Sequence, residues 1–324
     1  MRYLVVGGAG YLGSHLVEKL SSENHEIVVF DNHSGNVRTL YKQPISFIHG
    51  DVRNNEDFLR LDKYGKYDGV FHLAAKKSVP ESIEKPDLYL DVNSTGMTNV
   101  ISFCLERGIQ NLVSTSTAAV YGHADGLSVI TENSPVSPIN PYGLSKLLAE
   151  DELNRICNST FLNAVSLRTF NIIGTGREDF FDSRGENVLP MIVQKLKKSE
   201  TFTLFGKNYD TKDGTCVRDY LNVKDVADAH ILAMMYLELN LNLNSHQILN
   251  ISSGTGVSIF ELISKVEKFS GKKLNWCYSE NRPGDPASVI GDNTAAKNVI
   301  GWKPLVNIDE SIKESLGIFE KPMN

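Results

Sequence analysis

Cysteine is scarce in this sequence, and the few cysteines present are not paired. The 324 residues contain only Cys104, Cys157, Cys216 and Cys277, which lie far apart and form no CxxC motif. Isolated cysteines in a chain of this length favour reduced thiols over a disulfide framework or a zinc site. We therefore expect no metal site and a cytoplasmic protein with free thiols.

Long apolar runs and an excess of basic residues are also absent. No window reaches the roughly 18 apolar residues of a membrane span, and the apolar residues 3–6 end at Gly7-Gly8 without the long core of a signal peptide. The 33 Lys and Arg residues against 39 Asp and Glu give a net charge of −6. Because non-specific nucleic-acid binding needs a basic surface, we expect neither a nucleic-acid nor a membrane partner.

Short apolar runs alternate with amphipathic segments in the first half of the chain. This alternation predicts βαβ units and a parallel sheet with helices on both faces. The expected fold class is therefore α/β, with a doubly wound sheet of the Rossmann type. The predicted strands cover residues 3–6, 26–30, 45–49, 69–74, 111–114 and 164–170, and helices are expected within residues 14–20, 87–107 and 142–157.

From about Asn171 the pattern becomes mixed. We predict a Rossmann domain over residues 1–170 and a smaller mixed α/β lobe over residues 171–324. Segments within about 215–251 are expected to return to the first domain. The predicted elements are helices at 190–199 and 258–269, a strand at 247–251, loops at 174–185 and 238–245, and an irregular stretch at 202–219.

A glycine-rich turn follows the first predicted strand and precedes a helix. Gly7, Gly10 and Gly13 have GxxGxxG spacing. Glycine permits a sharp turn and close approach of the backbone to a pyrophosphate, and the helix start offers N–H groups to it. Asp31, 18 residues after Gly13, ends the second strand. A carboxylate there accepts hydrogen bonds from ribose hydroxyls and repels a 2′-phosphate, so we expect NAD rather than NADP.

Two residues on a predicted helix form a candidate catalytic pair. Tyr142 and Lys146 are four residues apart and therefore share one helix face. A cation beside a tyrosine favours the phenolate, which takes a proton from a hydroxyl while a hydride leaves the same carbon. Tyr220 and Lys224 have the same spacing, but they follow an extended segment. We prefer the first pair because the hydroxyl-rich residues 114–117 precede it at the end of a strand, where doubly wound sheets bind ligands.

This ordered set of residues resembles that of the extended short-chain dehydrogenases/reductases, and more narrowly that of the UDP-glucose 4-epimerase family. The most specific stretches are residues 205–220, which read FGKNYDTKDGTCVRDY, residues 282–285 (RPGD) and residues 76–82 (KKSVPES). The resemblance covers nearly the whole chain. It implies 4-epimerisation of a UDP-hexose through a transient 4-keto sugar, with Tyr142 as base, Thr117 bonded to the sugar 4-hydroxyl, and Lys146 on the nicotinamide ribose.

The resemblance also implies the residues that hold each ligand and a homodimer built on the helices at 87–107 and 142–157. The expected NAD-binding residues are Gly7, Gly10, Tyr11, Leu12, Gly13, Asp31, Asn32, Asn36, Asp51, Val52, Leu73, Ala74, Lys77, Asn93, Tyr142, Lys146 and Phe170. The expected UDP-sugar-binding residues are Thr117, Tyr142, Asn171, Asn187, Phe205, Arg218, Arg282, Asp285 and Ser288. Two arginines suit a diphosphate because their planar forks match phosphate oxygens.

Three positions depart from the family pattern: Thr169, Asn222 and Ser288. In this family a bulky residue at the position of Ser288 excludes N-acetylated sugars and a small one admits them. Ser288 is small, so we expect UDP-GlcNAc and UDP-GalNAc to be substrates as well.

Three other functions fit the same fold. A nucleotide-sugar 4,6-dehydratase needs an acid and a base directly after Thr117, where this chain has Ala118-Ala119. A simple NAD-dependent dehydrogenase would exchange its cofactor during turnover. A non-catalytic dinucleotide-binding regulator would have no need of Tyr142, Lys146 and Thr117 together, and fold alone does not decide function.

Overall fold

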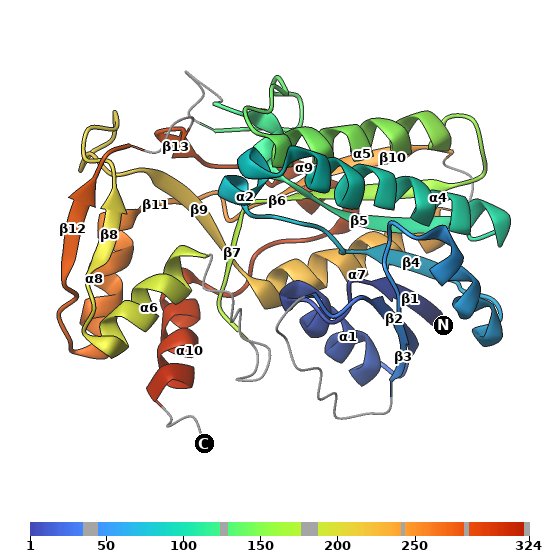
Figure 1. The fold of residues 1–324 in the computed structure, drawn as a ribbon, viewed down its shortest axis with the longest axis horizontal. Helices are drawn as coiled ribbons and strands as arrows, with labels where there is room; N and C mark the ends of the chain where they lie inside the picture. The colour runs from blue at the N-terminus through green and yellow to red at the C-terminus, as the bar shows by residue number, and fades with distance from the viewer. Residues whose placement is uncertain (35–44, 124–128, 176–186, 241–243, 282–284, 321–324) are drawn as a thin grey trace.

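The computed structural model describes residues 1–34, 45–123, 129–175, 187–240, 244–281 and 285–320 of the chain, and Figure 1 shows their arrangement. Among these residues, no helix is long and apolar enough to cross a membrane. All four cysteines are free thiols, as expected.

A sheet of seven strands, each parallel to its neighbours, forms the centre of the larger part of the molecule. The strand order is β10-β6-β5-β4-β1-β2-β3, so the order reverses between β1 and β4. Open α/β sheets bind ligands at such a reversal, beyond the carboxyl ends of the strands. The strands are β1 (Arg2–Val6), β2 (Glu26–Asp31), β3 (Ser46–His49), β4 (Gly69–His72), β5 (Asn111–Thr117), β6 (Asn163–Thr169) and β10 (His246–Ile251).

Both faces of this sheet are apolar and covered by helices, which confirms the predicted doubly wound α/β class. Tyr3 and Val5 pack into the core on one face, whereas Leu4 and Val6 pack into the core on the other. The first face is covered by α1 (Tyr11–Ser22), α7 (Val223–Leu239) and α9 (Thr294–Ile300), and the second by η1 (Asn55–Tyr64), α3 (Pro86–Leu90), the π-helical turn η2 (Asp91–Thr95), α4 (Gly96–Glu106) and α5 (Pro141–Cys157).

A smaller lobe with its own core lies beside the carboxyl ends of the large sheet, on the left in Figure 1. One small sheet has the order β11-β9-β13, with β7 also paired to β9, and a second sheet joins β8 to β12. These strands are β7 (Asn171–Ile173), β8 (Phe202–Phe205), β9 (Val217–Asn222), β11 (Gly256–Ser258), β12 (Trp276–Ser279) and β13 (Ser288–Val289). The lobe's helices are α6 (Val188–Lys198), α8 (Ile259–Ser270) and α10 (Ile308–Glu320), and the short helices α2 (Val79–Glu84) and η3 (Ala118–Tyr121) lie on connections of the large sheet.

The expectation of an irregular stretch at residues 202–219 was wrong at its two ends and holds between them, where residues 206–216 form no helix or strand. Residues 202–205 form β8, in which Phe202 and Leu204 are buried and Thr203 is exposed. The stretch ends inside β9, which pairs with β7, β11 and β13. Of the segment expected to return to the first domain, α7 and β10 lie on the large sheet, whereas β9 belongs to the small one.

Candidate active site

The glycine turn between β1 and α1 is packed too tightly for side chains. Gly7 has a φ of +86°, and a Cβ there would lie 2.4 Å from the backbone nitrogen of Ala74. A Cβ on Gly13 would lie 2.2 Å from the carbonyl oxygen of Gly7. Helix α1 begins directly after Gly10 without a side-chain cap. The turn therefore brings backbone N–H groups and the positive end of a helix dipole to the strand reversal, as a diphosphate requires.

Asp31 lies at the end of β2, directly beside this turn. Its carboxylate accepts hydrogen bonds from the backbone N–H groups of Ala9 at 2.9 Å and of His33 at 2.8 Å. A carboxylate offers about four lone-pair sites, so acceptor capacity remains for ribose hydroxyls. The neighbouring Asn32 donates its side-chain amide to Asp51 at 3.0 Å.

The remaining expected cofactor residues follow the same edge of the sheet. Asp51 is bound on both oxygens by Arg53, whose guanidinium holds the pKa of that carboxyl well below its usual range. Lys77 places its ammonium 6.0 Å from the ring centroid of Tyr11. Leu73 and Ala74 follow β4, Val52 and Leu12 pack into the two cores of the large sheet, and Phe170 follows β6. Asn36 lies outside the described residues.

Asn93 is buried and bonded to protein on both ends of its amide. Its oxygen accepts from the N–H of Lys76 at 2.8 Å, and its nitrogen donates to the carbonyl of Lys76 at 2.9 Å and to Oγ of Ser145 at 2.9 Å. Asn93 therefore ties the segment after β4 to α5. Its geometry is that of a brace for the site, so contact with a cofactor stays a prediction.

The candidate catalytic residues meet at the end of β5. Helix α5 starts at Pro141, capped by Asn140, which accepts from the N–H of Gly143 at 2.8 Å. Nζ of Lys146 donates to the carbonyl of Thr115 at 2.8 Å, and burial lowers the pKa of Lys146 to about 8. In the second pair, Tyr220 and Lys224, the ammonium of Lys224 is ion-paired with Glu314.

Tyr142 differs in one respect from the expectation. Burial raises the pKa of its phenol, and a hydrogen bond with the Thr117 side chain opposes that rise. The protein alone therefore keeps Tyr142 protonated, although the cation of Lys146 lies one turn away. The phenolate depends on further positive charge entering the site.

The expected sugar-nucleotide residues divide into two groups. Arg218 on β9 is paired with Asp285, Asn171 on β7 is the register partner of Tyr220, and Ser288 on β13 is the register partner of Val217. These residues surround β9. Phe205 ends β8 and Asn187 precedes α6, on separate elements of the lobe, and Arg282 lies outside the described residues.

Sequence reasoning missed a role for Tyr220. Its hydroxyl is buried and has no hydrogen-bond partner among the described residues. It lies two residues from Arg218 on the same strand and therefore on the same face. An unsatisfied buried hydroxyl is costly, which makes Tyr220 a candidate for contact with a ligand. The signal in the sequence is the alternation of side-chain direction along residues 217–220 (VRDY), which puts Tyr220 on the same face as Arg218.

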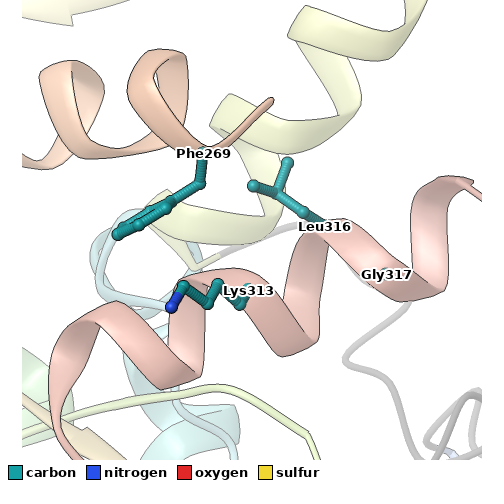
Figure 2. Close-up of a pocket in the computed structure, with 4 residues that line it drawn as sticks. All are labelled: Phe269, Lys313, Leu316 and Gly317. Carbon is teal, nitrogen blue, oxygen red and sulfur yellow. The ribbon is translucent and has the colours of Figure 1, made fainter. Parts of the chain in front are cut away.

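A pocket elsewhere in the smaller lobe is not part of this site. Phe269 of α8 and three residues of α10, Lys313, Leu316 and Gly317, line it. Figure 2 shows the ammonium of Lys313 beside the Phe269 ring, 5.0 Å from its centroid. The pocket holds none of the expected site residues.

Comparison with known proteins identifies the family to which this site belongs. Residues 3–251 match the model of the NAD dependent epimerase/dehydratase family. The chain belongs to this family. Among curated members, the UDP-glucose 4-epimerase of Lactobacillus helveticus is 36% identical over 320 residues, which cover 96% of this chain and 95% of the relative.

Solved structures of epimerase family members share the whole fold. The UDP-glucose 4-epimerase of Stenotrophomonas maltophila, with bound NAD and formylated UDP-arabinopyranose, superposes with a TM-score of 0.91 at 30% identity, covering 99% of this chain and 98% of that one. The UDP-Glc/GlcNAc 4-epimerase of Campylobacter jejuni has a TM-score of 0.83 at 32% identity, covering 98% of both chains.

Proposed function

We propose that this protein is an NAD-dependent isomerase of the UDP-glucose 4-epimerase type, which inverts C4 of the sugar in UDP-hexoses. The observation that carries the proposal is the position of Tyr142, Lys146 and Thr117. All three meet at the carboxyl end of β5, on the sheet edge that also holds the glycine turn and Asp31. Family membership and relatives that cover the whole chain support the same activity.

The residues present fit NAD. The turn at Gly7 and Gly13 leaves no room for side chains, and Asp31 is fixed beside it with free acceptor capacity. NAD, held by the glycine turn and Asp31, would supply the hydride-transfer chemistry and a positive charge at this site. The chain's own residues supply the proton chemistry.

Tyr142 takes the proton of the 4-hydroxyl and gives it back after the sugar has turned. Thr117 is bonded to the Tyr142 side chain, so it holds the sugar oxygen and the phenol together. Lys146 is fixed to the carbonyl of Thr115, and its cation favours the phenolate. The UDP part of the intermediate stays bound while its 4-keto sugar ring rotates. The ketone is therefore retained in the site until it is reduced again.

The group around β9 is proposed to hold UDP. Arg218 is buried and its guanidinium faces Asp285, while the unpartnered hydroxyl of Tyr220 lies on the same face. A diphosphate oxygen satisfies both donors. Asn171, Asn187, Phe205 and Ser288 complete the proposed substrate site, with Asp285 beside Arg218.

Substrate breadth is a finer proposal. Ser288 lies on β13 beside β9, and its small side chain leaves room for an N-acetyl group. The Campylobacter jejuni relative, which acts on both glucose and GlcNAc derivatives, supports this extension. We infer that UDP-GlcNAc and UDP-GalNAc are substrates as well.

We further propose that two chains pair through α4 and α5. Leu144 and Leu148 on α5 are one turn apart, 42% and 40% exposed, and form an apolar strip that a second copy would cover. Changing both to glutamate would leave a monomer by analytical ultracentrifugation. We place the protein in the cytoplasm, where its thiols would stay reduced.

A direct assay tests the activity. Purified protein is incubated with UDP-galactose and with UDP-GalNAc separately, without added cofactor, and the anomeric signals are followed by NMR. Conversion to the gluco epimer establishes an epimerase with resident NAD. No conversion of either sugar after NAD is added would overturn the proposal and favour a dehydrogenase or dehydratase.

A further inference from the structure

The end of β5 is bonded to α5 at three successive residues, of which the proposed function uses two. The third partner on α5 is Glu150, one turn beyond Lys146 and on the same helix face. The bonds join Thr117 to Tyr142, the carbonyl of Thr115 to Nζ of Lys146, and the hydroxyl of Ser116 to Oε1 of Glu150.

Glu150 is held in place by a buried arginine from the next strand. Arg168 on β6 donates from Nη2 to Oε2 of Glu150 at 2.6 Å and from Nε to Oε1 at 3.0 Å. The side chain of Glu150 is 3% exposed and that of Arg168 is 4% exposed. Arg168 is also the register partner of Ser116, and its guanidinium lies 4.8 Å from the ring centroid of Tyr121. The carboxylate is therefore held by side chains from two strands, Ser116 of β5 and Arg168 of β6.

Stability does not account for this pair. Removing two charges from water costs more than their attraction returns in many proteins, and a well-packed apolar pair of similar volume is often as stable or more so. Ser116, which binds Glu150, directly precedes Thr117 on β5, and Arg168 lies two residues before Phe170, which follows β6. A buried ion pair at this position instead sets the place of α5 relative to the strand ends.

The pair also shapes the charge around Lys146. Burial lowers the pKa of Lys146, and the negative charge of Glu150 opposes that change. A further carboxyl, that of Asp151, follows Glu150 on α5, and burial and the charge of Glu150 raise its pKa. Burial lowers the pKa of His72 on β4 and of His246 on β10, so both are neutral, and Tyr89 of α3 meets Tyr142 edge to face.

We propose that Glu150, locked by Arg168 and Ser116, is a positioning residue of the active site, which keeps α5 in register with the end of β5 and places a carboxylate one helix turn from Lys146. The kinetic test of this inference rests on the proposed function. The tests by thermal unfolding and by the titration of Lys146 rest only on the buried contacts. It assigns to the Glu150–Arg168 pair a role that spacing alone does not reveal.

Three variants of the pair, which are Glu150→Gln, Glu150→Asp and a double variant, separate this role from stability, and a fourth variant serves as control. Glu150→Gln keeps the shape and removes the charge. The double variant Glu150→Leu with Arg168→Met removes both charges and leaves an apolar pair. Glu152→Gln breaks the exposed pair with Arg155 on the same helix and serves as the matched control. Each is compared with the wild type by thermal unfolding, by kcat across pH, and by the titration of Nζ of Lys146 in 15N-lysine NMR, assigned with Lys146→Met.

We expect the double variant to unfold at or above the wild-type temperature, with kcat reduced about tenfold or more because the pair of Tyr142 and Lys146 is misplaced. In Glu150→Gln and in the double variant, Lys146 should lose its proton at lower pH than in the wild type. The alkaline limb of the kcat profile should also move to lower pH. Glu150→Asp, which keeps the negative charge, should retain part of the wild-type kcat and part of the wild-type Lys146 titration. Glu152→Gln should change neither kcat nor that titration.

A folded double variant with wild-type kcat and an unmoved Lys146 titration would overturn the proposal. If that variant does not fold, Glu150→Gln decides it on the same two readouts. A wild type that is inactive on UDP-hexoses would count against the proposed function, whereas the Lys146 titration would still test the inference.

Discussion

The hydroxyl of Tyr11 donates a hydrogen bond to the carbonyl oxygen of Gly174 at 2.5 Å, across 163 residues of sequence. Tyr11 opens α1 directly after the glycine turn, and Gly174 follows β7 of the smaller lobe. Next to Gly174, the N–H of Thr175 donates to Glu314 of α10, which also binds Asn222. The proposed NAD site and the proposed UDP-sugar site are thus joined by one phenol.

Tyr11→Phe should remove this hydrogen bond between α1 and the smaller lobe without disturbing the core of either part. Loss of a typical hydrogen bond costs about 1 kcal/mol, which we expect to appear as faster loss of NAD and weaker coupling between NAD and UDP binding. The measurement is the Kd of UDP by calorimetry with and without bound NAD. Tyr3→Phe is the control, because Tyr3 bonds Glu238 within the large domain. Equal coupling in both variants would show that Tyr11 serves only packing.

Tyr142→Phe should abolish turnover while leaving ligand binding intact. A positioned acid or base contributes roughly 10²–10⁴-fold to rate, so kcat should fall by at least that lower figure, with little change in the Kd of UDP. Lys146→Met should do the same and shift the pH at which the residual rate changes. The check is single-turnover kinetics beside calorimetry, and a Tyr142→Phe enzyme with more than a tenth of wild-type kcat would contradict the assignment.

Tyr220→Phe should have opposite effects on the free and the liganded protein. In the free protein the buried hydroxyl lacks a partner, so its removal should stabilise the fold by about 1 kcal/mol. In the complex the hydroxyl bonds a charged oxygen, so its loss should weaken UDP binding about tenfold or more. Thermal unfolding and UDP titration measure the two effects. A destabilised free protein would mean that the hydroxyl already has a partner.

Ser288→Tyr should narrow the substrate range. A bulky ring beside β9 would fill the space assigned to an N-acetyl group, so activity on UDP-GalNAc should fall at least tenfold more than activity on UDP-galactose. The ratio of the two kcat/KM values is the measurement. Retention of full N-acetyl activity would remove Ser288 from the specificity assignment and leave the epimerase proposal intact.

Acid should destabilise this fold because three histidines are held in the neutral form. Burial lowers the pKa of His72 to about 3 and those of His230 and His246 to about 4, from an ordinary value of 6.5. The unfolded chain binds these protons first, so the stability is present in full above pH 6.5 and is lost as the pH falls toward 4. A single shift of this size corresponds to about 3 kcal/mol.

Urea unfolding at pH 7.5, 6 and 5 measures this loss. His246→Gln should reduce the slope of stability against pH, since one site of proton uptake is gone. A slope that does not change in that variant would place the acid sensitivity elsewhere.

The large sheet was predictable because its strands are buried on both faces. Residues 3–6 are apolar throughout and residues 69–74 are apolar except for His72, and that signal is local. Strands β11 and β13 have three and two residues. They are strands only because β9 pairs with them, a long-range condition that no short window contains.

The site was predictable to the same extent. Spacing together with the preceding hydroxyl-rich residues 114–117 selected Tyr142 and Lys146, and the glycine turn selected the cofactor edge. The roles of Asn93 and Glu150 depend on which residues face them. Glu150 meets Arg168 because β5 and β6 pair Ser116 with Arg168, and that register follows only from the assembled sheet.

Strand β10 has a consequence for how the chain is made. It is the only neighbour that covers the outer edge of β6 in the described sheet, and it lies far downstream, after β7, α6, β8 and β9 of the smaller lobe. During synthesis the amino-terminal strands leave the ribosome first, and the edge of β6 stays open until β10 arrives. An open edge invites pairing with other chains. A gene fragment that encodes only the first 170 residues should therefore yield aggregates, and nascent chains stalled before β10 should need a chaperone.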